Sequence, residues 1–272
     1  NDHDIILSLE KMNAIEEIDI VGNTATVQAG VVLQALQEKV AENGLRFPLD
    51  LGARGSCTLG GNAATNAGGI NVIRYGMMRN LVLGLEAVLP DGTVMSSMNS
   101  MMKNNSGYDL KQLFIGTEGT LGVITRLIVR LFPQPLSENT ALVALTSFSS
   151  VTNLLNTLQN SLAGNLSAFE VMWNNYYHAV TEPGWHRSPM DRSYPFYALI
   201  SSEGFHSDTD RLAFESVLEN ALEDGLIVDA VIPKSSSETR TLWEIREDFE
   251  AILSPAPVYL YDVSLPIKHM DE

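Results

Sequence analysis

The chain has 272 residues but a single cysteine, Cys57, and few basic side chains. One cysteine cannot form an intrachain disulfide framework or a metal site built from several cysteines. Seventeen Lys and Arg residues stand against thirty-three Asp and Glu residues, which gives a net charge of −16. This acidity argues against nucleic-acid binding and against docking on an anionic membrane, because both need a basic surface.

Long hydrophobic runs and a signal sequence are also missing. No apolar run approaches the roughly 20 residues that span a bilayer, and no basic segment followed by an apolar stretch marks a signal peptide. With one cysteine, this composition predicts a cytoplasmic protein. A hydrophobic content of 45% is enough for a sizeable core, in one large domain or two of ordinary size. The chain starts without Met and ends a few mostly polar residues after a predicted strand, with no closing element, so we expect a piece of a longer protein.

Hydrophobic periodicity in the first half predicts mainly strands. The Asp91-Gly92 dipeptide between two apolar runs predicts a hairpin turn. Apolar residues at helical spacing predict a helix over 32–43, which Gly44 ends, and a short helix is expected over 108–115. The predicted strands cover residues 5–9, 25–30, 81–89, 94–95 and 123–132.

Pro133-Gln134-Pro135 is the predicted domain junction, and helices are longer beyond it. The order of the predicted elements is β-α-β-β-α-β, the split βαβ signature of ferredoxin-like domains, followed by one more helix and strand. The fold class is therefore expected to be α+β. The predicted strands are 140–145, 166–173, 194–201, 226–232 and 258–265, and the predicted helices are 149–162, 208–223 and 236–253.

Two glycine-rich segments are the candidate ligand sites. The first, residues 48–69, is almost uncharged and rich in Gly, Ser, Thr and Asn, so its backbone can approach a ligand closely and its N–H groups can converge on a phosphate. Tight turns between buried strands are the alternative explanation. The second, residues 116–124, can present backbone to an adenine, ribose or flavin edge, or is an ordinary turn between a helix and a strand.

Familiar nucleotide and hydrolase motifs do not match. Gly55 to Gly60 has the P-loop glycine spacing, but Gly61-Asn62 stands where Lys-Ser/Thr is required. No G-x-G-x-x-G opens a helix after a strand, so a Rossmann nicotinamide site is unsupported. Neither G-x-S-x-G nor H-E-x-x-H occurs.

An ordered set of motifs carries a specific resemblance. In the first half these are GSCTLGGNAATNAGG at 55–69, RYG at 74–76, GLEAVLPDGT at 84–93, NSGYDL at 105–110 and FIGTEGTLGVIT at 114–125. The second half adds LWEIRE at 242–247 and YDVSLP at 261–266. The set resembles the FAD-linked oxidases of the vanillyl-alcohol oxidase superfamily. It is most similar to the D-2-hydroxyacid dehydrogenase branch, with its D-lactate and D-2-hydroxyglutarate dehydrogenases.

The resemblance implies an α+β architecture in two parts. Residues 1–135 would be the second subdomain of a PCMH-type FAD-binding domain that lacks its first subdomain. Residues 136–272 would be a ferredoxin-like substrate or cap domain, incomplete at its C-terminus. It further implies non-covalent FAD, and the cofactor-binding residues carried over are Gly55, Ser56, Thr58, Gly60, Gly61, Asn62, Thr65, Gly68, Glu118, Gly119, Gly122 and Ile124.

The implied reaction is oxidation of a D-2-hydroxyacid to the 2-oxoacid, with hydride transfer to flavin N5. Electrons would pass to an electron-transfer flavoprotein or a quinone rather than to NAD, and an oligomer is compatible with this family. Arg246 matches the substrate-binding arginine, whose planar fork suits a carboxylate. The alternative for Arg246 is a surface ion pair with Glu247 or Glu250. No catalytic residue is assigned.

Two positions depart from the D-2-hydroxyglutarate pattern. Glu250 stands where a hydroxyl residue is expected, and Leu260 stands where a lysine is expected. Both changes disfavour a second carboxylate, so we expect a lactate-like or less acidic substrate. The rivals are a flavin oxidase or NADPH-dependent reductase on the same scaffold, and a non-catalytic fragment or subunit that cannot hold FAD alone. The five histidines lack metal-ligand spacing, and Cys57 is expected to be a small buried thiol rather than a flavin anchor.

Overall fold

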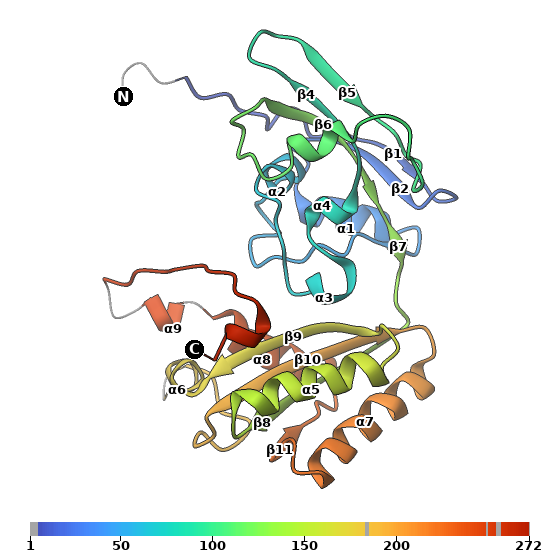
Figure 1. The fold of residues 1–272 in the computed structure, drawn as a ribbon. Coiled ribbons are helices and arrows are strands. Elements are labelled where there is room, and N and C mark those ends of the chain that lie inside the picture. The colour runs from blue at the N-terminus through green and yellow to red at the C-terminus, as the bar shows by residue number, and fades with distance from the viewer. Residues whose placement is uncertain (1–4, 183–184, 249, 254–256, 272) are drawn as a thin grey trace. The chain divides into compact units, whose positions relative to one another are not determined.

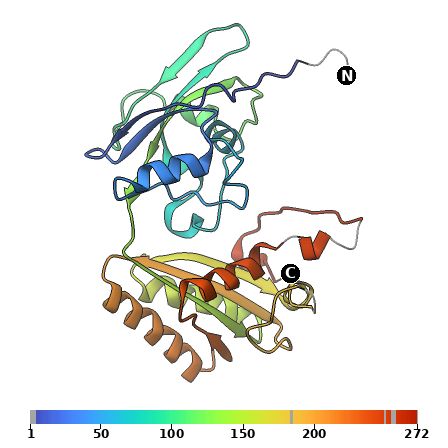
Figure 2. The ribbon, with the colours of Figure 1, turned by 180° about the vertical axis from the view of Figure 1, so that it is seen from behind.

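In a computed structural model the chain divides into two compact units, Asn1–Gln134 and Pro135–Glu272. The structure describes residues 5–182, 185–248, 250–253 and 257–271. Figures 1 and 2 show the ribbon from opposite sides. Each unit is a sheet with helices packed against it, and each has its own buried apolar core.

The first unit contains a five-stranded antiparallel sheet in the order β1-β2-β6-β4-β5. The predicted hairpin is confirmed: the Thr93 N–H donates to Asp91 Oδ1 at 2.9 Å, and Gly92 has a φ of 85°. A two-stranded sheet pairs β3 with β7. The bounds are β1 Ile15–Asp19, β2 Thr24–Gln28, β3 Leu45–Arg46, β4 Val82–Val88, β5 Val94–Ser97, β6 Val123–Arg130 and β7 Phe132–Pro133.

Short helices cover one face of this sheet (Figure 1). Helix α1 buries Leu33, Leu36 and Val40 at the spacing that predicted it, and Gly44 follows with a φ of 67°. Helix α2 lies inside the first glycine-rich segment, where no helix was predicted. The bounds are α1 Leu33–Ala41, α2 Leu59–Ala64, α3 Val72–Tyr75, α4 Met78–Leu81 and the 3₁₀ helix η1 Leu110–Leu113.

The second unit confirms the ferredoxin-like prediction. Its four antiparallel strands lie in the order β11-β8-β10-β9, which is the 4-1-3-2 order of that fold. Helices α5 and α7 cover one face of the sheet, and α6 and α8 cover the other (Figures 1 and 2). The strands are β8 Ser137–Leu145, β9 Leu166–Trp173, β10 Phe196–Gly204 and β11 Asp229–Val231. The helices are α5 Phe148–Ser161, α6 Asn174–Val180, α7 Ser207–Glu223, α8 Ser236–Glu247, α9 Glu250–Leu253 and η2 Ile267–His269.

Three predicted elements differ from the structure. Residues 5–9 and 258–265 are apolar enough for strands but form none, because they pair with no other strand in the described chain and lie mostly exposed. The helix predicted over 236–253 is interrupted at Asp248, whose Oδ1 accepts the Glu250 N–H at 3.0 Å and so begins α9. Among the described residues, no helix is both long and apolar enough to cross a bilayer.

Candidate functional site

The start of helix α2 is closed to a ligand. Its first two N–H groups are already used: Leu59 donates to the Val31 carbonyl at 2.9 Å, and Gly60 donates to the Ala29 carbonyl at 2.8 Å. These bonds satisfy groups that a helix N-terminus usually leaves for an anion. The N–H groups of Leu59 and Gly60 are therefore not available to an anion, and the loop before the helix is the nearest alternative.

That loop has open backbone groups and glycines that packing does not require. Within the described chain, the N–H groups of Gly52, Ala53 and Gly55 donate no hydrogen bond. A Cβ at Gly52 would meet nothing within 4 Å, and one at Gly55 would meet only the tip of Gln34 at 3.3 Å. The missing side chains thus leave room on the outside of the protein, as close approach of a ligand to the backbone requires.

The second glycine-rich segment packs on the other end of α2. The Gly116 N–H donates to the Ala63 carbonyl at 3.0 Å, and the Glu118 N–H donates to the Ala64 carbonyl at 2.9 Å. The last carbonyls of a helix have no partner within the helix, so the segment serves as its cap. Glu118 and Gly119 follow with φ of 52° and 79°. The two segments that the sequence singled out therefore meet at one helix.

Arg79, which the sequence analysis did not single out, connects the first segment to the residues just before the second. The main-chain N–H of Arg79 donates to Oδ1 of Asn66 at 2.9 Å, and Asn66 lies just beyond the end of α2. Its guanidinium donates to the Gln112 carbonyl at 2.9 Å, to Gln112 Oε1 at 2.7 Å and to the Ile115 carbonyl. These acceptors lie 33 and 36 residues away in the chain, so no local pattern signals this role.

The carried-over cofactor residues divide by exposure. The buried ones have packing explanations: a Cβ on Gly60 would lie 2.5 Å from the Ala29 Cβ, and one on Gly122 would lie 2.8 Å from the Val88 carbonyl. Cys57, expected to be buried, is half-buried. The exposed residues are Gly55, Ser56, Gly61, Thr65, Glu118 and Gly119, the half-buried ones are Thr58 and Gly68, and the buried ones are Gly60, Asn62, Gly122 and Ile124.

Arg246 lies in the second unit, in the last turn of α8. Its Nε and Nη2 both contact Oε2 of Glu170, at 2.9 Å and 2.5 Å. Glu170 is on β9, so this pair connects the helix to the sheet. The alternative pairing with Glu247 or Glu250 is not what the structure has, since the partner is 76 residues away.

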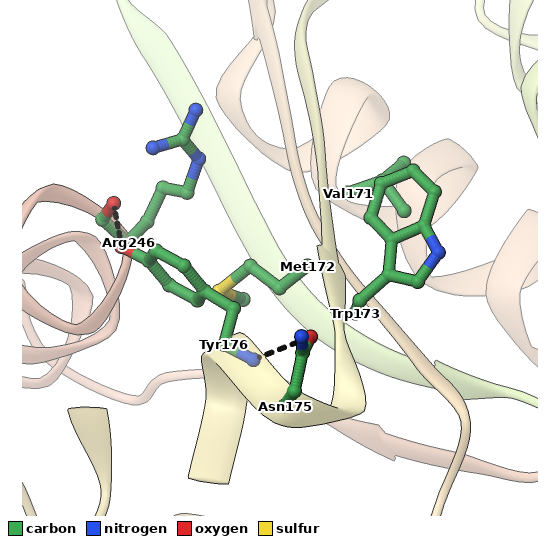
Figure 3. Close-up of a pocket in the computed structure, with 6 residues that line it drawn as sticks. All are labelled: Val171, Met172, Trp173, Asn175, Tyr176 and Arg246. Carbon is green, nitrogen blue, oxygen red and sulfur yellow. Dashed lines mark hydrogen bonds between the residues drawn. The ribbon is translucent and has the colours of Figure 1, made fainter. Parts of the chain in front are cut away.

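A cavity of about 450 Å³ opens beside this arginine (Figure 3). The Tyr176 hydroxyl, at its wall, donates to the Arg246 carbonyl at 2.6 Å, and burial raises the pKa of this phenol. One guanidinium among neutral walls suits a small organic anion with an apolar part. The lining residues are Val171, Met172, Trp173, Asn175, Tyr176 and Arg246.

Metal-ligating side chains do not cluster beside either region in the described part of the chain. Within the described residues, no three His, Cys, Asp or Glu side chains gather to hold an ion. The half-buried imidazole of His186 lies 2.9 Å from Asp248 Oδ2, where it connects the segment after α6 to the end of α8.

Comparison with known proteins gives matches along most of the chain. Residues 1–97 match the FAD binding domain family, and residues 134–272 match the C-terminal domain of the FAD linked oxidases. The chain is 43% identical over 268 residues to a Bos taurus protein named D-2-hydroxyglutarate dehydrogenase, mitochondrial, covering 98% of this chain and 49% of the relative. A mitochondrial Schizosaccharomyces pombe relative, provisionally named D-lactate dehydrogenase, is 41% identical over 266 residues, covering 97% of this chain and 51% of the relative. The chain thus spans about half the length of these relatives.

Solved structures agree at the level of the fold. Alkyldihydroxyacetonephosphate synthase superposes with a TM-score of 0.66 at 19% identity, over 89% of this chain and 47% of that one. p-Cresol methylhydroxylase with bound substrate gives 0.64 at 17% identity, over 85% and 50%. The expected PCMH-type fold is thereby confirmed.

The expectation of a cytoplasmic protein is wrong. Relatives from Bos taurus, Rattus norvegicus and Schizosaccharomyces pombe are named as mitochondrial proteins. A low cysteine count indicates a reducing environment, but more than one cellular compartment is reducing, so the count does not identify the compartment. The two domain matches, the relatives and the fold agree, and the chain belongs to the family of FAD-linked oxidases.

Proposed function

We propose that the protein is an FAD-dependent dehydrogenase that oxidises a D-2-hydroxyacid to the 2-oxoacid. The observation that carries the proposal is the guanidinium of Arg246 at the wall of an otherwise neutral cavity. A guanidinium binds a carboxylate bidentately, and a 2-hydroxyacid presents a carboxylate next to the carbon to be oxidised. The names of the relatives support the same class of reaction.

The residues present fit the FAD that this family implies. The open N–H groups of the 52–56 loop suit its pyrophosphate, and the uncharged, exposed side of α2 with Gly61 and Thr65 suits its remaining surface. Glu118 and Gly119 complete the surface from the second segment. FAD, when bound, supplies the acceptor for the hydride at flavin N5. The assignment of residues 1–135 to FAD and of 136–272 to substrate belongs to this proposal.

The residues of the second unit bind and orient the substrate. Arg246 holds the carboxylate, and the Tyr176 hydroxyl fixes the end of α8 through the Arg246 carbonyl. Trp173 and Met172 offer apolar surface to the rest of the substrate. No described residue is assigned as the base that removes the hydroxyl proton.

The preferred substrate has one carboxylate, as in D-lactate. Glu170 already neutralises part of the charge of Arg246, and the exposed Glu250 follows four residues later. Leu260 adds no cation. A second substrate carboxylate near Arg246 would therefore be repelled by the negative charge of Glu170. The electron acceptor is proposed to be a carrier such as an electron-transfer flavoprotein, or a quinone.

Dye-coupled turnover of the complete FAD-loaded protein with D-lactate, D-2-hydroxyglutarate and L-lactate tests this function. We expect turnover of D-lactate above that of the diacid and no turnover of L-lactate. Oxygen consumption without dye would instead support the oxidase alternative. Turnover of none of these acids would refute the proposal.

The second candidate is a fragment or subunit that keeps the fold without holding FAD, which the half-length match to the relatives favours for this chain taken alone. Adding FAD to the chain, desalting it and recording a visible spectrum separates the two. A retained flavin band contradicts the second candidate, and a colourless chain supports it.

A further inference from the structure

The guanidinium of Arg246 is held along one of its two hydrogen-bonding edges. Glu170 Oε2 accepts from both Nε and Nη2, which form the side edge of the planar fork. In the part of the chain that the structure describes, Nη1 contacts no hydrogen-bond acceptor. The end-on edge, formed by Nη1 and Nη2, thus remains for a ligand carboxylate.

Both members of the pair are fixed in place. Glu170 lies on β9 next to Met172, on the sheet face that α8 covers, and its side chain is only 21% exposed. A half-buried carboxylate in such apolar surroundings is costly without a partner, and Arg246 supplies the partner. The Tyr176 hydroxyl holds the main chain of Arg246 from the other side. The guanidinium is therefore oriented before substrate arrives.

We infer that Glu170 is a positioning residue that also sets the charge of the substrate this site accepts. It presents the end-on edge of Arg246 to one carboxylate, and its own negative charge disfavours a second. The inference rests on the proposed function and specifies its substrate class: 2-hydroxymonocarboxylates with an apolar side chain.

The charges around the cavity support this assignment. Apart from Arg246, every lining residue is neutral, and the ion pair of Arg246 with Glu170 has no net charge. One incoming carboxylate loses water on entering the cavity, and hydrogen bonds from Nη1 and Nη2 of Arg246 replace those that it made to the water. A second carboxylate would find no second cation among the lining residues and would lie in the field of the Glu170 carboxylate.

Glu170→Gln is the informative variant, because it keeps the shape and one oxygen acceptor while removing the charge. The readout is the ratio of kcat/KM for D-2-hydroxyglutarate to kcat/KM for D-lactate. We expect the ratio to rise by about 3- to 10-fold, since the variant relieves repulsion of the second carboxylate across several ångströms. Glu215→Gln, which removes the acid paired with Arg211 within α7, is the matched control and should leave the ratio unchanged.

Two further measurements separate specificity from folding. Glu170→Asp keeps the charge but shortens the side chain, so it should raise KM for both acids and keep the wild-type ratio. Calorimetric binding of pyruvate and 2-oxoglutarate to the FAD-loaded protein gives the same comparison without turnover. A purely structural ion pair would weaken both ligands equally in every variant.

A ratio that stays within twofold of wild type in Glu170→Gln would overturn the inference, as would the same shift in Glu170→Asp. The two proposals fail in different ways. If the wild type oxidises neither acid, the proposed function is wrong, and the calorimetric comparison still decides the role of Glu170. If the wild type oxidises D-lactate and the ratio does not move, the inference alone is wrong.

Discussion

Replacing Arg79 by Met should loosen residues 112–115, which lead into the second glycine-rich segment, and so weaken FAD binding. The substitution keeps a side chain of similar length but removes three hydrogen bonds, two to Gln112 and one to the Ile115 carbonyl. The main-chain bond from Arg79 to Asn66 remains, so α4 should keep its place. The damage should stay local to residues 110–119.

The structure gives the expected size of this effect. A hydrogen bond from a charged donor contributes about 1.5–3 kcal/mol, and three on one guanidinium are not additive. Because Arg79 is only partly buried, we take about 2–3 kcal/mol as the loss in the stability of the ordered segment. If FAD binds only the ordered form and the ordered form is marginally stable, its dissociation constant should rise by up to roughly 30- to 150-fold.

Fluorescence titration of apoprotein with FAD measures this loss, and limited proteolysis within 110–119 reports the loosening of these residues. Arg126→Met is the matched control, since that arginine also carries several contacts in the first unit, but to Glu16 and Glu86 on the sheet. It should change FAD affinity little. Arg79→Met with a wild-type circular dichroism spectrum and FAD affinity within threefold of wild type would refute the role of the arginine.

Three other predictions use different observations. Gly55→Val should leave the thermal midpoint nearly unchanged yet reduce FAD affinity. Gly60→Val should instead unfold the first unit, because its Cβ would lie 2.5 Å from the Ala29 Cβ. Calorimetry and FAD titration of both variants check this contrast. Arg246→Lys keeps the charge but loses the fork, so KM for a D-2-hydroxyacid should rise by roughly 10- to 100-fold at unchanged FAD content, and equal KM values would contradict the substrate role. Burial raises the pKa of Tyr197 to about 12. The contribution of this neutral phenol to stability is therefore complete below the unfolded pKa near 10 and is lost as pH rises toward about 12. Urea unfolding between pH 9 and 11.5 should show that the free energy of unfolding falls more steeply with pH in wild type than in Tyr197→Phe.

Local patterns predicted most of the second unit. The strand over 166–173 has the predicted bounds, and the helices over 149–162 and 208–223 differ by one residue at their ends. Each of these elements buries one face in the core of its own unit, so hydrophobic spacing carries the information. The order of elements then leaves few topologies, and the observed sheet order is one of them.

The errors fall where a neighbour decides the conformation. Residues 258–265 have the composition of a strand, but a strand needs a partner edge, and nothing in the segment says whether one exists. Helix α2 was missed because Gly60 and Gly61 disfavour a helix in isolation. It forms because its N–H groups meet the carbonyls of Ala29 and Val31 and its last carbonyls meet Gly116 and Glu118.

The candidate sites show the same limit, because the sequence identifies a residue but not the residue that it contacts in the fold. Composition singled out both glycine-rich segments and motif resemblance singled out Arg246, yet neither gave a reason to consider Glu170 or Arg79. Each of these acts through side chains or carbonyls more than 30 residues away. A charged side chain that is half-buried must find a partner in the fold, and sequence spacing does not tell which one. Residues that contact a ligand can thus be predicted from a motif. Residues that orient those contacts are found only in the folded chain, from the ion pairs and hydrogen bonds that each charged side chain makes.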